Sequence, residues 1–111
     1  MRVIAKIKGL RRSPSKMRLV VDAIRGKGAQ DALDVLKFMP SPAAREVAKV
    51  VRSAVANAEN NYQMIPGGLK IVAISADPGP MLKRIRPRSR GRTSPILRRS
   101  CHITVAVDEE A

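Results

Sequence analysis

The stretch LKRIRPRSRGRTSPILRR, Leu82 to Arg99, decides the fold of this chain of 111 residues. Eight of its eighteen residues are Lys or Arg, and none is Asp or Glu. Pro87, Gly91 and Pro95 interrupt it. The segments on either side of this stretch predict which structure this positively charged segment adopts.

Two apolar segments flank the basic stretch. LKIVAISA, at 69–76, is typical of a strand, although periodicity alone does not exclude a short helix. CHITVAV, at 101–107, alternates like a strand. If the two strands pair, the chain between them continues as a hairpin, because residue 88 is the midpoint of 69–107. Its predicted tip is Arg88, Ser89, Arg90 and Gly91.

Each arm of this hairpin has about ten residues beyond the body, so it projects on the order of 30 Å. Both strands of such a ribbon are edges, which tolerate proline. A two-stranded ribbon is marginal in water, and like charges on facing arms weaken it further. We therefore expect it to become ordered against a polyanion; the alternative is a disordered basic loop.

The rest of the chain predicts the body. RVIAKIK, at 2–8, alternates like a strand, Ser13-Pro14 begins a helix over 14–25, and AQDALDVLKFM, at 29–39, is a short helix. The longest helix follows Ser41-Pro42 and has a wide apolar face. The predicted class is α+β: a small antiparallel three-stranded sheet packed against three helices, with a long projecting β-hairpin. We expect one domain, with a globular body over about 1–78 and 100–111 and a basic hairpin over about 79–99.

The net charge of +13 favours an anionic partner. Residues 1–21 contribute +7 and residues 78–107 contribute +8, while the segment between them is almost neutral. No apolar run is long enough to span a bilayer, so no membrane partner is expected. A single cysteine indicates a reducing compartment.

Folded RNA is the partner that the basic stretch favours. Arginine outnumbers lysine there, and guanidinium groups bind phosphate with paired hydrogen bonds. A second cluster, Arg11, Arg12, Lys16 and Arg18, opposes the dipole of the first helix, and a bound phosphate would relieve that repulsion. The only two aromatic residues, Phe38 and Tyr62, are expected in the core, which favours recognition of backbone and shape over base stacking.

Catalytic and metal sites are not indicated. Cys101 and His102 are adjacent on a strand, so their side chains point to opposite faces and do not form a dyad. One Cys and one His are too few for a zinc site. We expect no enzyme activity, no metal and no cofactor.

Three segments resemble a known family, the bacterial-type large-subunit ribosomal protein twenty-two family. They are SPSKMRLVVDAIRGK at 13–27, ANAENN at 56–61 and GPMLKRIRPRSRGRTSPILRRSCHITVAV at 79–107. The resemblance implies a structural protein of the large ribosomal subunit that binds its rRNA, aids early assembly and lines the nascent-peptide exit tunnel with its hairpin. The implied partners are large-subunit rRNA, neighbouring ribosomal proteins and the nascent polypeptide, in the ribosome of the cytoplasm or of an organelle.

The resemblance also implies which residues contact rRNA. Arg86 fills a position that is usually apolar in the family. The predicted rRNA-binding residues are Arg11, Arg12, Lys16, Arg18, Lys83, Arg84, Arg86, Arg88, Arg90, Arg92, Arg98 and Arg99.

Three other classes of protein would differ from this one in their sequence or their binding. A free-standing nucleoid or RNA-chaperone protein would bind DNA and RNA about equally. A membrane-surface protein would need an amphipathic basic helix, but the densest charge lies in a segment interrupted by Pro and Gly. An enzyme would need a convergent polar pocket.

Overall fold

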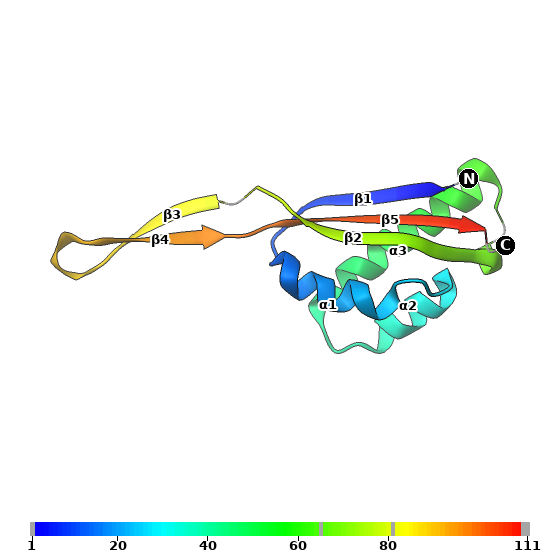
Figure 1. The fold of residues 1–111 in the computed structure, drawn as a ribbon, viewed down its shortest axis with the longest axis horizontal. Coiled ribbons are helices and arrows are strands. Elements are labelled where there is room, and N and C mark those ends of the chain that lie inside the picture. The colour runs from blue at the N-terminus through cyan, green and yellow to red at the C-terminus, as the bar shows by residue number, and fades with distance from the viewer. Residues whose placement is uncertain (1, 65, 81, 110–111) are drawn as a thin grey trace.

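The chain forms an α+β structure with a projecting hairpin (Figure 1). The computed structural model describes the backbone of residues 2–64, 66–80 and 82–109, and their side chains except at 66, 82–84 and 93–98. Within these residues three helices cover one antiparallel sheet, of order β1-β5-β2, and a second sheet pairs β3 with β4. The predicted fold class is confirmed. The elements are β1 (Val3–Leu10), α1 (Pro14–Ile24), α2 (Ala29–Phe38), α3 (Pro42–Tyr62), β2 (Leu69–Pro78), β3 (Leu82–Pro87), β4 (Thr93–Arg98) and β5 (Cys101–Glu109).

Ser-Pro pairs begin two of the three helices. Pro14 and Pro42 lie in the first turns of α1 and α3, where a missing backbone N–H costs nothing. Gly26 follows the end of α1 with φ of 79°, a left-handed conformation that glycine adopts without a Cβ clash. The helix ends at Ile24, one residue before the predicted Arg25.

The core lies between the helices and one face of the three-stranded sheet. The central strand β5 presents Cys101, Ile103, Val105 and Val107 to the helices, and all four are fully buried. The apolar face of α3 packs opposite them. Its buried residues are Ala43, Ala44, Val47, Ala48, Val50, Val51, Ala54, Val55 and Ala58.

The two aromatic residues are not in the core, contrary to the prediction. Phe38 is 81% exposed and Tyr62 is 49% exposed. Each is the last residue of its helix. Phe38 lies two positions after the buried Leu36, about 200° around the helix, so it points away from the core.

The hairpin makes the molecule elongated. The principal extents are 64 × 26 × 18 Å, and the radius of gyration is 17.2 Å. A compact chain of this length would have a radius of gyration of about 13 Å. In Figure 1 the β3–β4 ribbon leaves one end of the sheet, continuing β2 and β5, and the start of β1 and the end of β5 lie at the other end.

Candidate nucleic-acid interface

The hairpin ends in a tight turn of basic residues. Pro87 pairs with Thr93, so residues 88–92 form the connection between β3 and β4. The backbone N–H of Arg88 donates to the carbonyl of Arg92. Arg90 and Gly91 both have positive φ, 61° and 72°, which reverses the chain direction. All four residues of the predicted tip lie in this turn.

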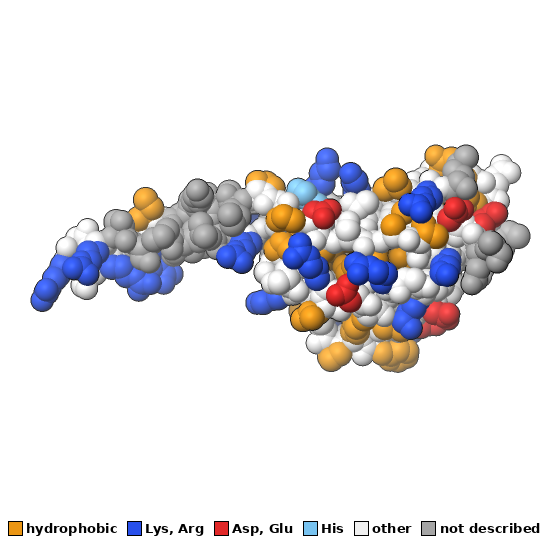
Figure 2. Space-filling model, viewed as in Figure 1, with side chains coloured by type: hydrophobic (Ala, Val, Ile, Leu, Met, Phe, Trp, Pro, Cys, Tyr) orange, Lys and Arg blue, Asp and Glu red, His pale blue; other side chains and the backbone are white. Residues whose placement is uncertain are grey.

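The hairpin arginines with described side chains lie in solvent. Arg86, Arg88, Arg90 and Arg92 are exposed, and none has an acidic partner among the described residues. Figure 2 shows Lys and Arg side chains gathered along this end of the molecule. Lys83 and Arg84 lie on β3 and Arg98 ends β4, but their side chains lie outside the described residues. The tip is therefore a surface of unneutralised guanidinium groups.

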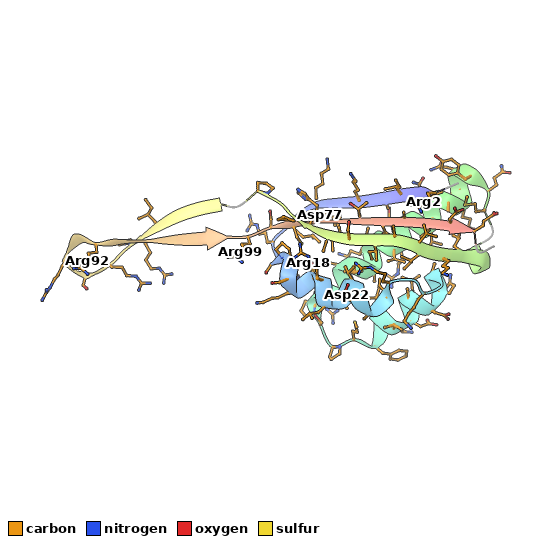
Figure 3. All side chains as sticks on the ribbon, viewed as in Figure 1. Arg2, Arg18, Asp22, Asp77, Arg92 and Arg99 are labelled. Atoms are coloured by element: carbon orange, nitrogen blue, oxygen red, sulfur yellow. The ribbon has the colours of Figure 1, made fainter. Side chains whose placement is uncertain are left out.

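A hollow at the base of the hairpin contains two more arginines. It has a volume of about 330 Å³, and Arg18 and Arg99 contribute its cations. Ser13, Pro14 and Ser15 bring the start of α1 into the same hollow, opposite Pro78 to Gly79 and Ser100. Figure 3 shows Arg18, Arg99 and Arg92 at successive positions along the long axis. Positive charge thus continues from the tip to the body.

The start of α1 in this hollow carries no anionic group of its own. Its first turn has no acidic residue, and Ser13 makes no side-chain capping hydrogen bond among the described residues. Instead, Ser13 Oγ lies 2.8 Å from Ser15 Oγ. The positive end of the helix dipole therefore adds to the charges of Arg18 and Arg99.

The structure separates the four basic residues that the sequence placed in one cluster. Arg18 lies in the hollow at the hairpin base. Arg11, Arg12 and Lys16 line another hollow, of about 570 Å³, between α1 and the connection from α2 to α3. Ser13 lines both hollows, so the start of α1 divides them.

Two members of this cluster have partners within the chain. Arg12 Nε lies 2.7 Å from Glu46 Oε2 of α3. Arg18 Nε donates to the carbonyl of Ala76 on β2, at 3.3 Å. Sequence reasoning missed both contacts because the partners are 34 and 58 positions apart, with no local pattern connecting them.

The base of the hairpin is held by hydrogen bonds from both of its sides. The Gly79 N–H donates to the Ser100 carbonyl at 2.9 Å, and Ser100 Oγ donates to the Pro80 carbonyl at 2.6 Å. His102 Nδ1 accepts from the Gly9 N–H at 3.0 Å, at a bulge in β1. The imidazole therefore has a structural role at this joint.

Cys101 and His102 do not form a catalytic pair. Cys101 is fully buried in the core, whereas His102 is partly exposed on the other face of the sheet. Burial raises the pKa of the Cys101 thiol, the Glu46 carboxylate raises it further, and Arg12 opposes the rise. A neutral buried thiol is a poor nucleophile.

Metal binding and membrane crossing find no support in the part of the chain that the structure describes. No cluster of three or more His, Cys, Asp or Glu side chains there is placed to hold a metal ion. No helix among those residues has the length and apolar character needed to cross a bilayer.

Comparison with known proteins identifies relatives over almost the whole chain. Residues 5–108 match the model of the family described as Ribosomal protein L22p/L17e. A curated protein of Dehalococcoides mccartyi, named large ribosomal subunit protein uL22, is 56% identical over 107 residues, which cover 96% of this chain and 98% of the relative. The protein of the same name from Herpetosiphon aurantiacus is 50% identical over 109 residues, covering 98% and 96%.

A relative from Acaryochloris marina, also named large ribosomal subunit protein uL22, is 52% identical over 107 residues, covering 96% of this chain and 89% of the relative. These relatives are bacterial, and their family is one of structural proteins rather than enzymes. A ribosomal protein of this bacterial type is cytoplasmic and located in the ribosome. The match over residues 5–108 shows that the chain belongs to the Ribosomal protein L22p/L17e family.

Proposed function

We propose that the chain is a structural constituent of the large ribosomal subunit, as its curated relatives are named, and that its hairpin binds large-subunit rRNA. One observation carries the proposal: exposed arginines without acidic partners among the described residues occupy a ribbon that projects from the body. Such a surface is costly in isolation, because the charges repel one another. Neutralisation by closely spaced phosphates removes that cost.

The hollow at the hairpin base supplies the contact between the body and rRNA. Arg18, Arg99 and the start of α1 face one space of about 330 Å³. A phosphate there would receive charge-assisted hydrogen bonds from guanidinium groups and the favourable end of the helix dipole. The three basic residues of the other hollow, Arg11, Arg12 and Lys16, lie beside the connection from α2 to α3 instead.

The hairpin arms become ordered on rRNA as the RNA folds around them, which suits a role in early subunit assembly. We propose the division into a body over 1–78 and 100–111 and a hairpin over 79–99, which the separate β3–β4 sheet and the Gly79–Ser100 hydrogen bond support. The narrow form of the ribbon suits a place in the wall of the nascent-peptide exit tunnel. There its tip would face the passing polypeptide.

A charge reversal at the tip tests rRNA binding. The variant Arg88→Glu/Arg90→Glu/Arg92→Glu keeps the core intact, because all three side chains are exposed. Its matched control reverses three exposed basic residues of α3: Arg45→Glu, Lys49→Glu and Arg52→Glu. Both variants undergo the same change in net charge, so a difference between them reports on position.

Binding is measured to folded large-subunit rRNA over a range of salt concentrations, with duplex DNA and unrelated RNA as competitors. The tip variant should show a salt slope shallower by roughly 2 to 3, at 0.7 to 0.9 per lost phosphate contact, while the α3 control stays close to wild type. It should also enter assembled subunits poorly. Equal slopes for the two variants would refute the proposal for the tip, and loss of the complex to duplex DNA would favour a free-standing nucleic-acid-binding protein.

A further inference from the structure

A surface of the body away from the hairpin exposes large apolar side chains. Leu19 of α1 is 75% exposed, and Phe38 at the end of α2 is 81% exposed. Figure 2 shows hydrophobic side chains gathered at the margin of the body where α2 and its connection to α3 lie. Large apolar side chains exposed on one part of a small protein point to a contact with another molecule.

This surface adjoins the hollow of about 570 Å³ between α1 and the α2–α3 connection. The apolar part of its lining comes from Leu19, Val20, Met39, Pro40 and Ala43. These aliphatic side chains offer room for an apolar group, which gains free energy in proportion to the area it removes from water.

Cations border the apolar lining. Arg11, Arg12 and Lys16 line the same hollow, and Arg12 is already paired with Glu46. Arg11 and Lys16 are exposed and have no acidic partner among the described residues. A fourth cation lies beside Phe38, because Lys37 Nζ is 5.9 Å from the centre of the Phe38 ring. An occupant of this surface must therefore be both apolar and anionic.

We propose that this hollow, with the exposed Leu19 and Phe38, is a docking surface for an extended segment of another protein. The segment inserts an apolar side chain against Leu19, Met39 and Pro40 and places Asp or Glu carboxylates on Arg11 and Lys16. An apolar centre with a charged rim is the usual anatomy of a protein–protein contact. RNA fits less well, because its backbone presents phosphate and ribose and has no aliphatic group to place against the apolar lining of Leu19, Val20, Met39, Pro40 and Ala43.

This inference does not rest on rRNA binding by the hairpin, because the two surfaces use different residues. The first test treats purified ribosomes with a water-soluble carbodiimide, which joins a lysine amine to a carboxylate in contact with it. We expect an amide bond between Lys16 and an Asp or Glu of another protein, within a few residues of a large apolar side chain. Lys49, exposed on α3, is the control lysine and should not reach that segment.

The apolar part of the surface is tested by the variant Leu19→Ser/Phe38→Ser. Both side chains are exposed, so the body keeps its fold, but the yield of the Lys16 linkage should fall about tenfold if apolar anchors are lost. Benzoylphenylalanine in place of Phe38 should crosslink to the same protein segment under light. Absence of a Lys16–carboxylate bond, an unchanged yield in the double variant, or a crosslink from position 38 to rRNA would each overturn the proposal.

Discussion

Alanine in place of Gly79 tests the joint between the body and the hairpin. A Cβ atom at this position would lie 2.6 Å from Ser100 Oγ and 3.0 Å from His102 Cε1. Both separations are shorter than van der Waals contact allows. Ser100 Oγ can rotate away, but only if it gives up its 2.6 Å hydrogen bond to the Pro80 carbonyl. His102 is held by its bond from the Gly9 N–H.

The free energy of unfolding should fall by a modest amount. Losing a solvent-accessible hydrogen bond costs about 0.5 kcal/mol, and residual strain in a packed contact costs about 1 kcal/mol. Reduced freedom of the unfolded chain returns about 0.5 kcal/mol, as for any Gly→Ala change. The net loss is about 1 kcal/mol, which lowers Tm by roughly 4 °C in a chain of this size.

The assay is thermal unfolding followed by circular dichroism, with Gly67→Ala as the control. A Cβ at Gly67 meets nothing within 4 Å, so that variant should be as stable as wild type or slightly more so. The effect of Gly79→Ala should also depend on Ser100, whose Oγ is the atom nearest the new Cβ. In a Ser100→Ala background, Gly79→Ala should lower the free energy of unfolding clearly less. The reasoning fails if Gly79→Ala is as stable as Gly67→Ala, or if the effects of the changes at 79 and 100 simply add.

Three further predictions concern the body. Ile103→Ala, in the fully buried centre of β5, should lower the free energy of unfolding in urea by about 3 kcal/mol. Ile4→Ala, at a side chain that is 54% exposed, should lower it by less than about 0.5 kcal/mol. Similar losses for the two variants would contradict the packing described. The pKa of the Cys101 thiol is raised in the folded protein, so the unfolded chain loses this proton first as pH rises. The free energy of unfolding is therefore unaffected by this group below the ordinary thiol pKa of 9.0 and falls as pH rises from there through the folded value. Wild type should therefore lose more stability than Cys101→Ala above pH 9, and parallel pH profiles would argue against it. Arg25→Ala removes a 3.0 Å hydrogen bond to the Ile74 carbonyl on the edge of β2, so light scattering should detect more self-association than for Arg45→Ala.

The elements that the sequence predicted well are those with short-range signals. Alternation of apolar residues gave the buried face of β5, and the Ser-Pro pairs gave the starts of α1 and α3 within a residue. The hairpin followed from the pairing of β2 with β5, which brings the two ends of the basic segment together. Each of these features depends on residues within about ten positions of one another, or on a single pairing.

The features that the sequence did not reveal depend on where elements pack. From the sequence, Arg12 and Arg18 are both predicted to be free cations at the start of a helix. In the structure Arg12 pairs with Glu46 and Arg18 donates to the Ala76 carbonyl, because α3 and β2 lie beside α1. The sequence places Phe38 in the nearly neutral middle segment and so predicts it in the core, but its angular position on α2 turns it outward. The separation of one basic cluster into two hollows is likewise a consequence of tertiary structure.

The placement of Arg18 and Arg25 explains how the body can set the direction of the hairpin. Arg18 of α1 and Arg25, which directly follows α1, donate to the carbonyls of Ala76 and Ile74. They therefore cover the outer edge of β2 just before the chain enters the hairpin. On the other side of β5, the bond from Gly9 to His102 ties β1 to the same level of the sheet. The root of the hairpin is therefore fixed from both edges of the sheet, while the arms beyond it pair only with each other. Ordering by a polyanion then needs to fix only the distal arms, because their direction is already set by the body.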